Sequence, residues 1–388
     1  MSGFSTAGLD RLAEVAASHV GSDRVPGLVA LAASGDDVHV EALGSLSIDG
    51  PPVQRDSLFR IASTTKPTTG AVTMALVDEG LLTLEEPVRR LLPELATRRV
   101  LRRMDGPLDD TVAAEREITV RDLLTFTFGF GMHVGMFMAA TPWPIALAAT
   151  EAQLGTFGPP DPKTPPDPDQ WIERLGSLPL MAQPGERWLY NTGAQVLSVL
   201  CQRAAGASSY SEVLRSRLLQ PLGMTETAFF TAETSRLATA YVNTADGLAV
   251  YDPPDGDWSR RPAFDDTAAG LLSTVDDLFA FARMFLRRGA PVLSSRSVRE
   301  MTRDQLNPGQ REGQEAFLGD RSWGLCQSVV VSGDRAGAFG WDGGFGSSFL
   351  VDPVRDLVVI VLTQRVWDTA QPPAVHTDLQ AAAYAALS

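Results

Sequence analysis

Strand-like segments stand at both ends of this 388-residue chain and helical segments fill its middle, and this order constrains the fold most. Helical periodicity dominates from Ser63 to about residue 265. Short strands are predicted on either side of that stretch, at residues 27–33, 38–43, 57–61, 323–331, 336–340, 347–351 and 357–363. We therefore expect an α/β fold of the α+β type, in which both chain ends build one antiparallel sheet flanked by helices. Residues 1–62 and 266–388 would form this sheet subdomain, residues 63–265 an all-helical inserted subdomain, and the active site would lie at their junction.

A hydroxyl and an amine lie three residues apart in Ser63-Thr-Thr-Lys66, at the start of a predicted helix. Side chains at positions i and i+3 of a helix lie one above the other, about 5–6 Å apart at Cβ, so Lys66 can reach the Ser63 oxygen. A serine becomes a good nucleophile when a neighbouring base takes its proton, and a Ser-Lys pair does this without histidine. An N-cap serine followed by a solvated lysine is the competing interpretation.

The helix predicted after this pair supports the catalytic interpretation. Residues 68–79 are apolar and rich in alanine, which is typical of a buried central helix that holds its first turn rigidly. Pro67 falls in the first turn, where its missing N–H costs nothing, and Gly80 is placed to end the helix.

Tyr190 precedes a second apolar helix, predicted over residues 195–205. An ammonium beside a phenol lowers the phenol pKa, so a tyrosine next to the Ser-Lys pair could act as the base and relay the Ser63 proton. A tyrosine that packs its ring and makes one hydrogen bond is the alternative.

Glycines are concentrated in Phe339-Gly-Trp341-Asp-Gly343-Gly344-Phe-Gly346, which indicates that another group approaches this backbone closely. We expect the N–H groups of Gly344 and Ser63 to form an oxyanion hole, in which a single donor is typically worth about 3 kcal/mol. A glycine-rich hairpin with a bulge is the alternative.

Bulky, soft side chains are frequent between residues 126 and 143, with Phe128 and Phe130 among them. Either they belong to the core or they line a substrate pocket, in which case the acyl or alcohol moiety of the substrate is apolar.

Composition excludes several classes of partner. The formal charge of −14 disfavours binding to nucleic acid or to anionic membranes, and no apolar run approaches a membrane span. Cys201 and Cys326 have no metal or redox spacing, and the four histidines fall in no catalytic motif, so neither a metal nor a cofactor is expected. The first residues lack a signal-peptide pattern, so we expect a cytoplasmic protein; the oligomeric state stays open.

The order of Ser63-x-x-Lys66, Tyr190 and Trp341-x-Gly343 resembles that of the penicillin-recognising serine enzymes, in particular their class C β-lactamase-like branch. Further stretches are similar to the same branch, at residues 59–67, 81–88 with 92–94, 118–125, 220–224 and 269–277. The resemblance implies the β-lactamase/transpeptidase fold, with Ser63 as nucleophile, Lys66 as its partner and Tyr190 as base.

Two departures from the β-lactamase pattern guide the functional prediction. β-Lactamases of this branch have Tyr-x-Asn and Lys-Thr-Gly, whereas here Asn191 follows Tyr190 directly and Trp341 replaces the lysine, as in the esterases of the branch. An indole cannot pair with a substrate carboxylate, which favours neutral esters. We expect a carboxylesterase that acts on a small-molecule ester or amide, and we count Asn191, Trp341 and Gly343 among the substrate-binding residues. A β-lactamase, a D-amino-acid amidase or peptidase, an acyltransferase, or a non-catalytic ligand-binding homologue remain the alternatives.

Overall fold

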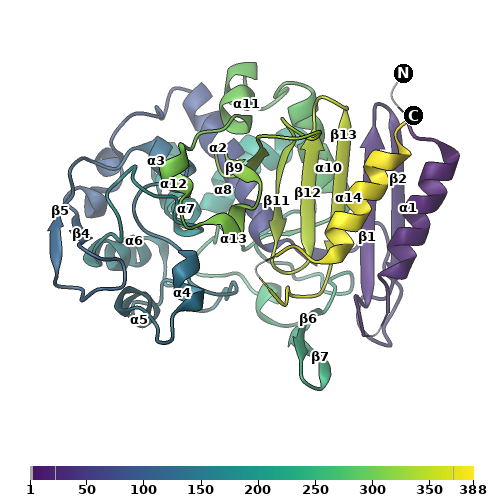
Figure 1. The fold of residues 1–388 in the computed structure, drawn as a ribbon, viewed down its shortest axis with the longest axis horizontal. Coiled ribbons are helices and arrows are strands. Elements are labelled where there is room, and N and C mark those ends of the chain that lie inside the picture. Colours follow the sequence, from purple (N-terminus) through teal and green to yellow (C-terminus); the bar gives the residue numbers. More distant parts are fainter. Residues whose placement is uncertain (1–2, 22, 370) are drawn as a thin grey trace.

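A seven-stranded antiparallel sheet, built from both ends of the chain, forms one side of the molecule (Figure 1). The computed structural model describes residues 3–21, 23–369 and 371–388. The strand order is β2-β1-β13-β12-β11-β10-β9, so the N-terminal hairpin pairs with the last strand of the chain. Its strands are β1 (Gly27–Ser34), β2 (Asp37–Gly44), β9 (Arg321–Trp323), β10 (Ser328–Val330), β11 (Phe339–Gly343), β12 (Ser347–Asp352) and β13 (Leu357–Thr363). The predicted mixed fold with a sheet built from both ends is confirmed.

Helices cover both faces of the sheet. The terminal helices α1 (Thr6–Ser18) and α14 (Ala374–Ala386) lie together on one face, and α10 (Val275–Leu286) lies on the other (Figure 1). Every residue of β1 and β13 is buried, because neither is an edge strand and helices cover both faces of the sheet here.

The segment between the two halves of the sheet was expected to be all-helical; it is mainly helical but also carries two short antiparallel ladders. Antiparallel pairing joins β4 (Arg99–Leu101) to β5 (Thr111–Ala113), and β6 (Ala240–Thr244) to β7 (Gly247–Asp252). The main α-helices of this segment are α2 (Lys66–Asp78), α3 (Val120–Leu124), α4 (Val134–Met138), α5 (Pro144–Glu151), α6 (Pro168–Ser177), α7 (Thr192–Ala205), α8 (Tyr210–Leu214) and α9 (Gln220–Leu222). Three short helices, α11 (Ser295–Thr302), α12 (Pro308–Arg311) and α13 (Glu315–Leu318), precede β9.

The central helix α2 has the properties that its sequence predicts. All of its residues from Lys66 to Leu76 are buried, and Pro67 lies in the first turn. Gly80 follows the helix with a φ of +75°, a conformation that glycine adopts without strain. The helix therefore gives a rigid support to the residues at its N-terminus.

Two strand predictions were wrong. The predicted strand at 57–61 is reduced to β3 (Phe59–Arg60), which lies outside the large sheet and pairs with β8 (Leu272–Ser273). The N-terminal end therefore contributes only β1 and β2 to the large sheet. The predicted strand at 323–331 is a hairpin of β9 and β10, because Gly324 N–H bonds the Gln327 carbonyl and Cys326 has a φ of +59°.

None of the helices formed by the described residues is both long and apolar enough to cross a membrane.

Candidate active site

Ser63 and Lys66 form a hydrogen-bonded pair where the helical segment meets the sheet. Lys66 Nζ donates to Ser63 Oγ at 2.9 Å. Ser63 lies half-buried in a 3₁₀ turn (Ala62–Thr65) that leads directly into α2, and Lys66 is the first residue of that helix. The contact that the i, i+3 spacing predicts is therefore present. Ser63 lies in the 3₁₀ turn and Lys66 in the α-helix that follows it.

Backbone strain lies next to both Ser63 and Tyr190. Ala62 has a φ of +41° and Asn191 a φ of +85°, both in a region that residues with a side chain rarely adopt. Such residues persist where the surrounding structure fixes them, and they concentrate at functional sites.

Burial controls the charge of Lys66. Its side chain has no exposed surface, and Nζ donates a second hydrogen bond to the Ala268 carbonyl at 2.8 Å. Desolvation lowers the pKa of Lys66 to about 7, and the nearby Asp266 carboxylate opposes this change. A lysine with this pKa is substantially unprotonated at neutral pH and can accept a proton from Ser63.

Tyr190 is held beside this pair by its backbone and by its hydroxyl. Its N–H and C=O pair with Met132, which fixes the strand-like segment before α7. Lys66 Nζ lies 4.4 Å from the centre of the tyrosine ring, and Trp341 Nε1 donates to Tyr190 Oη at 2.7 Å. The structure thus brings Ser63, Lys66 and Tyr190 together.

The expected direction of the Tyr190 pKa was wrong. Burial raises this pKa above its ordinary value, although interactions with Ser63 and Trp341 favour the phenolate. Burial outweighs the cation because Tyr190 lies among the aromatic rings of Phe126, Trp188 and Trp323. Tyr190 is therefore a neutral phenol in this site, and Lys66 is the better proton acceptor.

The glycine-rich strand β11 approaches the segment before Ser63 very closely. A Cβ on Gly343 would lie 2.2 Å from the Ile61 carbonyl oxygen, so only glycine fits there. Ser347 Oγ, opposite Gly343, donates to the same carbonyl at 2.6 Å. Gly343, expected to bind substrate, instead allows this close packing.

Gly344 differs from Gly343 in being accessible. It is half-buried, and no atom lies within 4 Å of the position where a Cβ would stand. Its N–H donates no hydrogen bond to any residue in the described part of the chain, while its carbonyl accepts from Trp367 N–H at 2.8 Å. This leaves the Gly344 N–H available as a donor.

Asn191, expected to bind substrate, has a structural role instead. It is buried, and its side-chain amide donates to the Thr156 carbonyl at 3.0 Å. The next residue, Thr192, bonds the Thr156 hydroxyl. Because Asn191 is one position out of register with the β-lactamase pattern, its amide points into the protein.

Phe128 and Phe130 were also expected to contact substrate, and both are completely buried in the core. Other aromatic residues extend from Tyr190 towards the surface. Phe317 stacks on Tyr190 at 5.4 Å between ring centres, and Phe137 packs edge-on against Phe317 at 5.8 Å.

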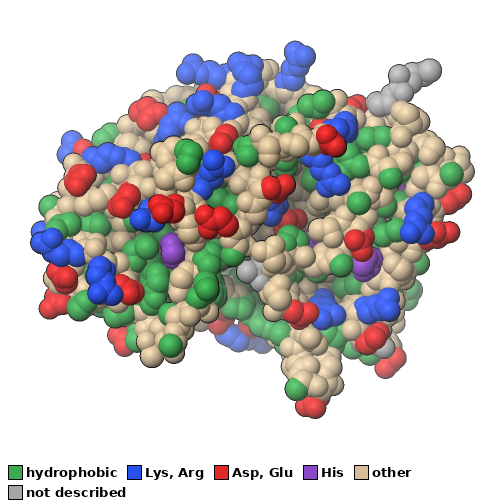
Figure 2. All heavy atoms as spheres, in the orientation of Figure 1, with side chains coloured by type: hydrophobic (Ala, Val, Ile, Leu, Met, Phe, Trp, Pro, Cys, Tyr) green, Lys and Arg blue, Asp and Glu red, His purple; other side chains and the backbone are tan. Residues whose placement is uncertain are grey.

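Phe137 is 65% exposed, and the adjacent Met138 is 81% exposed. Figure 2 shows hydrophobic side chains gathered over the position of α4, which carries both residues. We use the name aromatic strip for the rings of Phe317 and Phe137 together with the adjacent Met138 side chain. The strip connects the Tyr190 ring to an exposed apolar surface.

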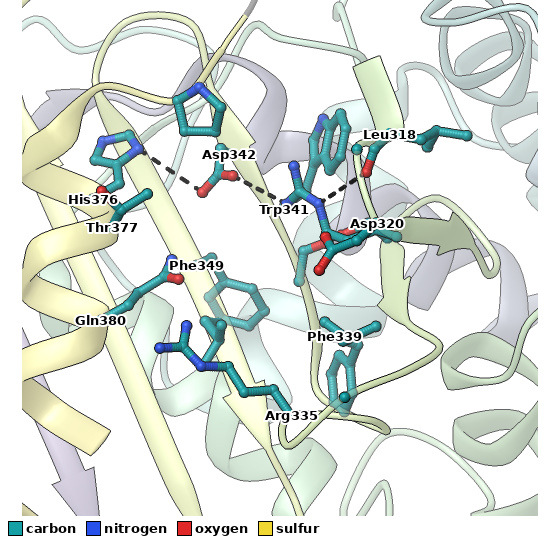
Figure 3. A pocket seen from close by; sticks show the side chains of 18 of the residues that line it. Leu318, Asp320, Arg335, Phe339, Trp341, Asp342, Phe349, His376, Thr377 and Gln380 are labelled. Carbon is teal, nitrogen blue, oxygen red and sulfur yellow. Dashed lines mark hydrogen bonds and ion pairs between the residues drawn. The ribbon is translucent and has the colours of Figure 1, made fainter. Parts of the chain in front are cut away.

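Three residues of the site were missed by sequence reasoning. Asp266 raises the pKa of Lys66, and Phe317 stacks on the ring of Tyr190. The Arg321 guanidinium lies 4.9 Å from the centre of the Trp341 indole, whose surroundings Figure 3 shows. None of them belongs to a motif. Asp266 stands just before the family-like stretch at 269–277, which is the one signal that could have pointed to it.

Comparisons with known proteins identify the family of the chain. The sequence profile of the beta-lactamase family matches residues 12–384. Protein Rv1367c of Mycobacterium tuberculosis is 38% identical over 85% of this chain and 83% of its own length. Esterase EstB of Burkholderia gladioli is 29% identical over 90% of this chain and 88% of its own length. Among solved structures, EstCE1, a hydrolase with promiscuous acyltransferase activity, superposes with a TM-score of 0.78 at 22% identity over 97% of this chain and 99% of its own. The chain therefore belongs to the beta-lactamase family.

Proposed function

We propose that this protein is a serine hydrolase that cleaves neutral carboxylic esters through an acyl-enzyme at Ser63. The hydrogen bond between Ser63 Oγ and a completely buried Lys66 carries this proposal, because burial lowers the pKa of Lys66 to about 7. A serine beside an amine that is partly unprotonated at neutral pH is an activated nucleophile.

In acylation, Ser63 Oγ attacks the ester carbonyl carbon and its proton passes to Lys66 Nζ. The Gly344 and Ser63 N–H groups stabilise the oxyanion. The ester C–O bond then breaks, and the leaving alkoxide takes the hydroxyl proton of Tyr190. Acylation ends with Ser63 acylated, Lys66 protonated and Tyr190 as phenolate, and an alcohol has been released.

Deacylation reverses these proton transfers. The Tyr190 phenolate takes a proton from water, and the resulting hydroxide attacks the acyl carbon. Ser63 Oγ leaves and receives the proton held by Lys66. The products are a carboxylic acid and a free enzyme in its starting protonation state, so the cycle balances.

The surroundings of the site support a neutral, apolar substrate. Trp341 stands where a β-lactamase has its cationic anchor, and the nearby Arg321 is already paired with Asp342 at 3.2 Å. The aromatic strip offers apolar surface to an acyl or alcohol group. Neither the neutral Trp341 nor the paired Arg321 therefore offers a free cation to a substrate carboxylate, whereas an apolar chain would bury apolar area on the strip.

Acyl transfer to an alcohol is a second candidate. EstCE1 is described as a hydrolase with promiscuous acyltransferase activity, and both reactions share the acyl-enzyme. The exposed aromatic strip supports it, because an apolar alcohol bound there could compete with water. That the protein acts in the cytoplasm stays a prediction from its sequence.

The test combines active-site labelling with substrate comparison. A fluorophosphonate probe should add once to the wild-type protein and not to Ser63→Ala, whereas the exposed Ser332→Ala serves as the matched control and should label normally. Wild type should hydrolyse p-nitrophenyl butyrate, with an acyl-enzyme visible by intact mass, and Ser63→Ala should not.

Each part of the proposal has an outcome that contradicts it. Labelling or turnover that survives in Ser63→Ala would refute the nucleophile. A higher kcat/KM for the β-lactam nitrocefin than for p-nitrophenyl butyrate would replace the esterase with a β-lactamase. Added alcohols that receive the acyl group faster than water would favour the transferase.

A further inference from the structure

Trp341 links the Tyr190 hydroxyl to a guanidinium on another strand. Trp341 Nε1 donates to Tyr190 Oη at 2.7 Å, and the Arg321 guanidinium carbon lies 4.9 Å from the centre of the indole. The indole is 6% exposed, and Trp323 packs edge-on against it at 4.8 Å. A cation over an aromatic face is attracted to it, and this attraction is stronger where water is excluded.

Arg321 is itself held in place by a chain of hydrogen bonds. Its Nη1 pairs with Asp342 Oδ2 at 3.2 Å, and its Nε donates to the Leu318 carbonyl at 3.4 Å. Asp342, 8% exposed, also accepts from Ser348 Oγ at 2.7 Å, and the Gln380 amide of α14 donates to that hydroxyl at 3.0 Å. Figure 3 marks the contacts of the guanidinium with Asp342 and Leu318 beside Trp341, and the contact of Asp342 with His376 of α14. The guanidinium is thus fixed from two sides.

We propose that Arg321 is a positioning residue for Tyr190. Arg321 acts through the Trp341 indole, so that the hydroxyl proton of Tyr190 points to the leaving group. This inference rests on the proposed ester hydrolysis. A phenol has one donor hydrogen and two acceptor sites. Because the indole N–H occupies an acceptor site, it directs the phenol hydrogen away from Trp341.

The charged groups around Tyr190 act on it in opposite directions. Lys66 of α2 lies over its ring, Arg321 of β9 favours the phenolate, and Asp342 of β11 opposes it. From α14, His376 lies 3.9 Å from Asp342, and burial lowers the pKa of this histidine, which keeps it neutral. Removal of Arg321 would leave Asp342 uncompensated and make Tyr190 a weaker acid.

A weaker or misdirected acid matters only where the leaving group needs a proton. The alkoxide of an alkyl ester must take the Tyr190 proton as the C–O bond breaks, whereas p-nitrophenolate is stable enough to leave without one. Loss of Arg321 should therefore slow acylation by alkyl esters and spare acylation by p-nitrophenyl esters.

The experiment compares ethyl butyrate with p-nitrophenyl butyrate, which form the same acyl-enzyme. Arg321→Gln should lower kcat/KM for ethyl butyrate by about ten- to a hundredfold, and for p-nitrophenyl butyrate by less than about threefold. Arg321→Lys, which restores the cation, should recover most of the ethyl butyrate activity. Trp341→Phe, which keeps a ring but lacks the N–H, should show the same selective loss as Arg321→Gln.

Arg335 provides the matched control. It also stacks on an aromatic ring, that of Tyr384 at 4.3 Å, and it lines the same pocket as Arg321 and Trp341, where Figure 3 labels it. Arg335→Gln should leave both activities unchanged. Equal losses for the two esters in Arg321→Gln, or no loss for either, would overturn the positioning role. Wild-type protein that hydrolyses neither ester would overturn the proposed function, and this inference with it.

Discussion

Direct titration of Lys66 tests the central physical argument about this site. Lys66 and Lys163 are the only lysines of the chain, so lysine labelled with ¹³C at Cε gives two NMR signals, and Lys66→Met assigns them. Lys66 should titrate near pH 7. Lys163 is the internal control: it is 67% exposed, and its ion pair with Asp257 at 2.7 Å raises its pKa.

The same shift has a consequence for stability. The pKa of Lys66 falls from 10.5 to about 7 on folding, so between these values the unfolded chain binds more protons than the folded protein. Folding therefore becomes more favourable as pH rises through this window. Because one pKa unit corresponds to about 1.4 kcal/mol, the free energy of unfolding should gain about 2 kcal/mol from this group between pH 7 and pH 9.

Urea unfolding of wild type and Lys66→Met at pH 7, 8 and 9 measures this contribution. The difference between the two proteins isolates the lysine, since all other titrating groups are shared. Wild type should gain about 2 kcal/mol relative to Lys66→Met over this range. A Lys66 signal that titrates above pH 10, or equal pH dependence of the two proteins, would refute the argument that burial keeps this amine unprotonated.

Two further predictions concern rate and specificity. Lys66→Ala and Tyr190→Phe should each lower kcat/KM for ethyl butyrate by about 10²–10⁴-fold. Because the two residues act in one proton-transfer unit, the double variant should be little less active than the weaker single variant. Multiplicative losses would indicate separate roles. Across p-nitrophenyl esters from acetate to octanoate, kcat/KM should rise by up to about fourfold per methylene that the aromatic strip covers. Phe137→Ser should flatten this rise and leave the acetate rate unchanged. Leu147→Ser, which alters another exposed apolar residue (52% exposed), is the control and should keep the rise of the wild type. An unchanged series in Phe137→Ser would exclude the strip as a binding surface.

The sequence alone determined the local parts of this protein. The spacing of Ser63 and Lys66 places the two side chains in contact because it depends only on helical geometry. The buried α2 and its end at Gly80 follow equally from local composition and from backbone preference. The order of the elements predicted the sheet built from both chain ends. The short segment at 57–61 was the exception, because it pairs with β8 outside this sheet.

Only the tertiary structure decided the electrostatics and the contacts between distant segments. The pKa of Tyr190 rises and that of Lys66 falls because both side chains are desolvated by the whole core, which no motif records. Phe128 and Phe130 belong to that core rather than to a substrate pocket, a choice that bulk and polarity in the sequence could not make. Arg321 reaches Trp341 only because β9 and β11 lie in the same sheet, two strands apart, and such pairing depends on the complete fold rather than on any local pattern.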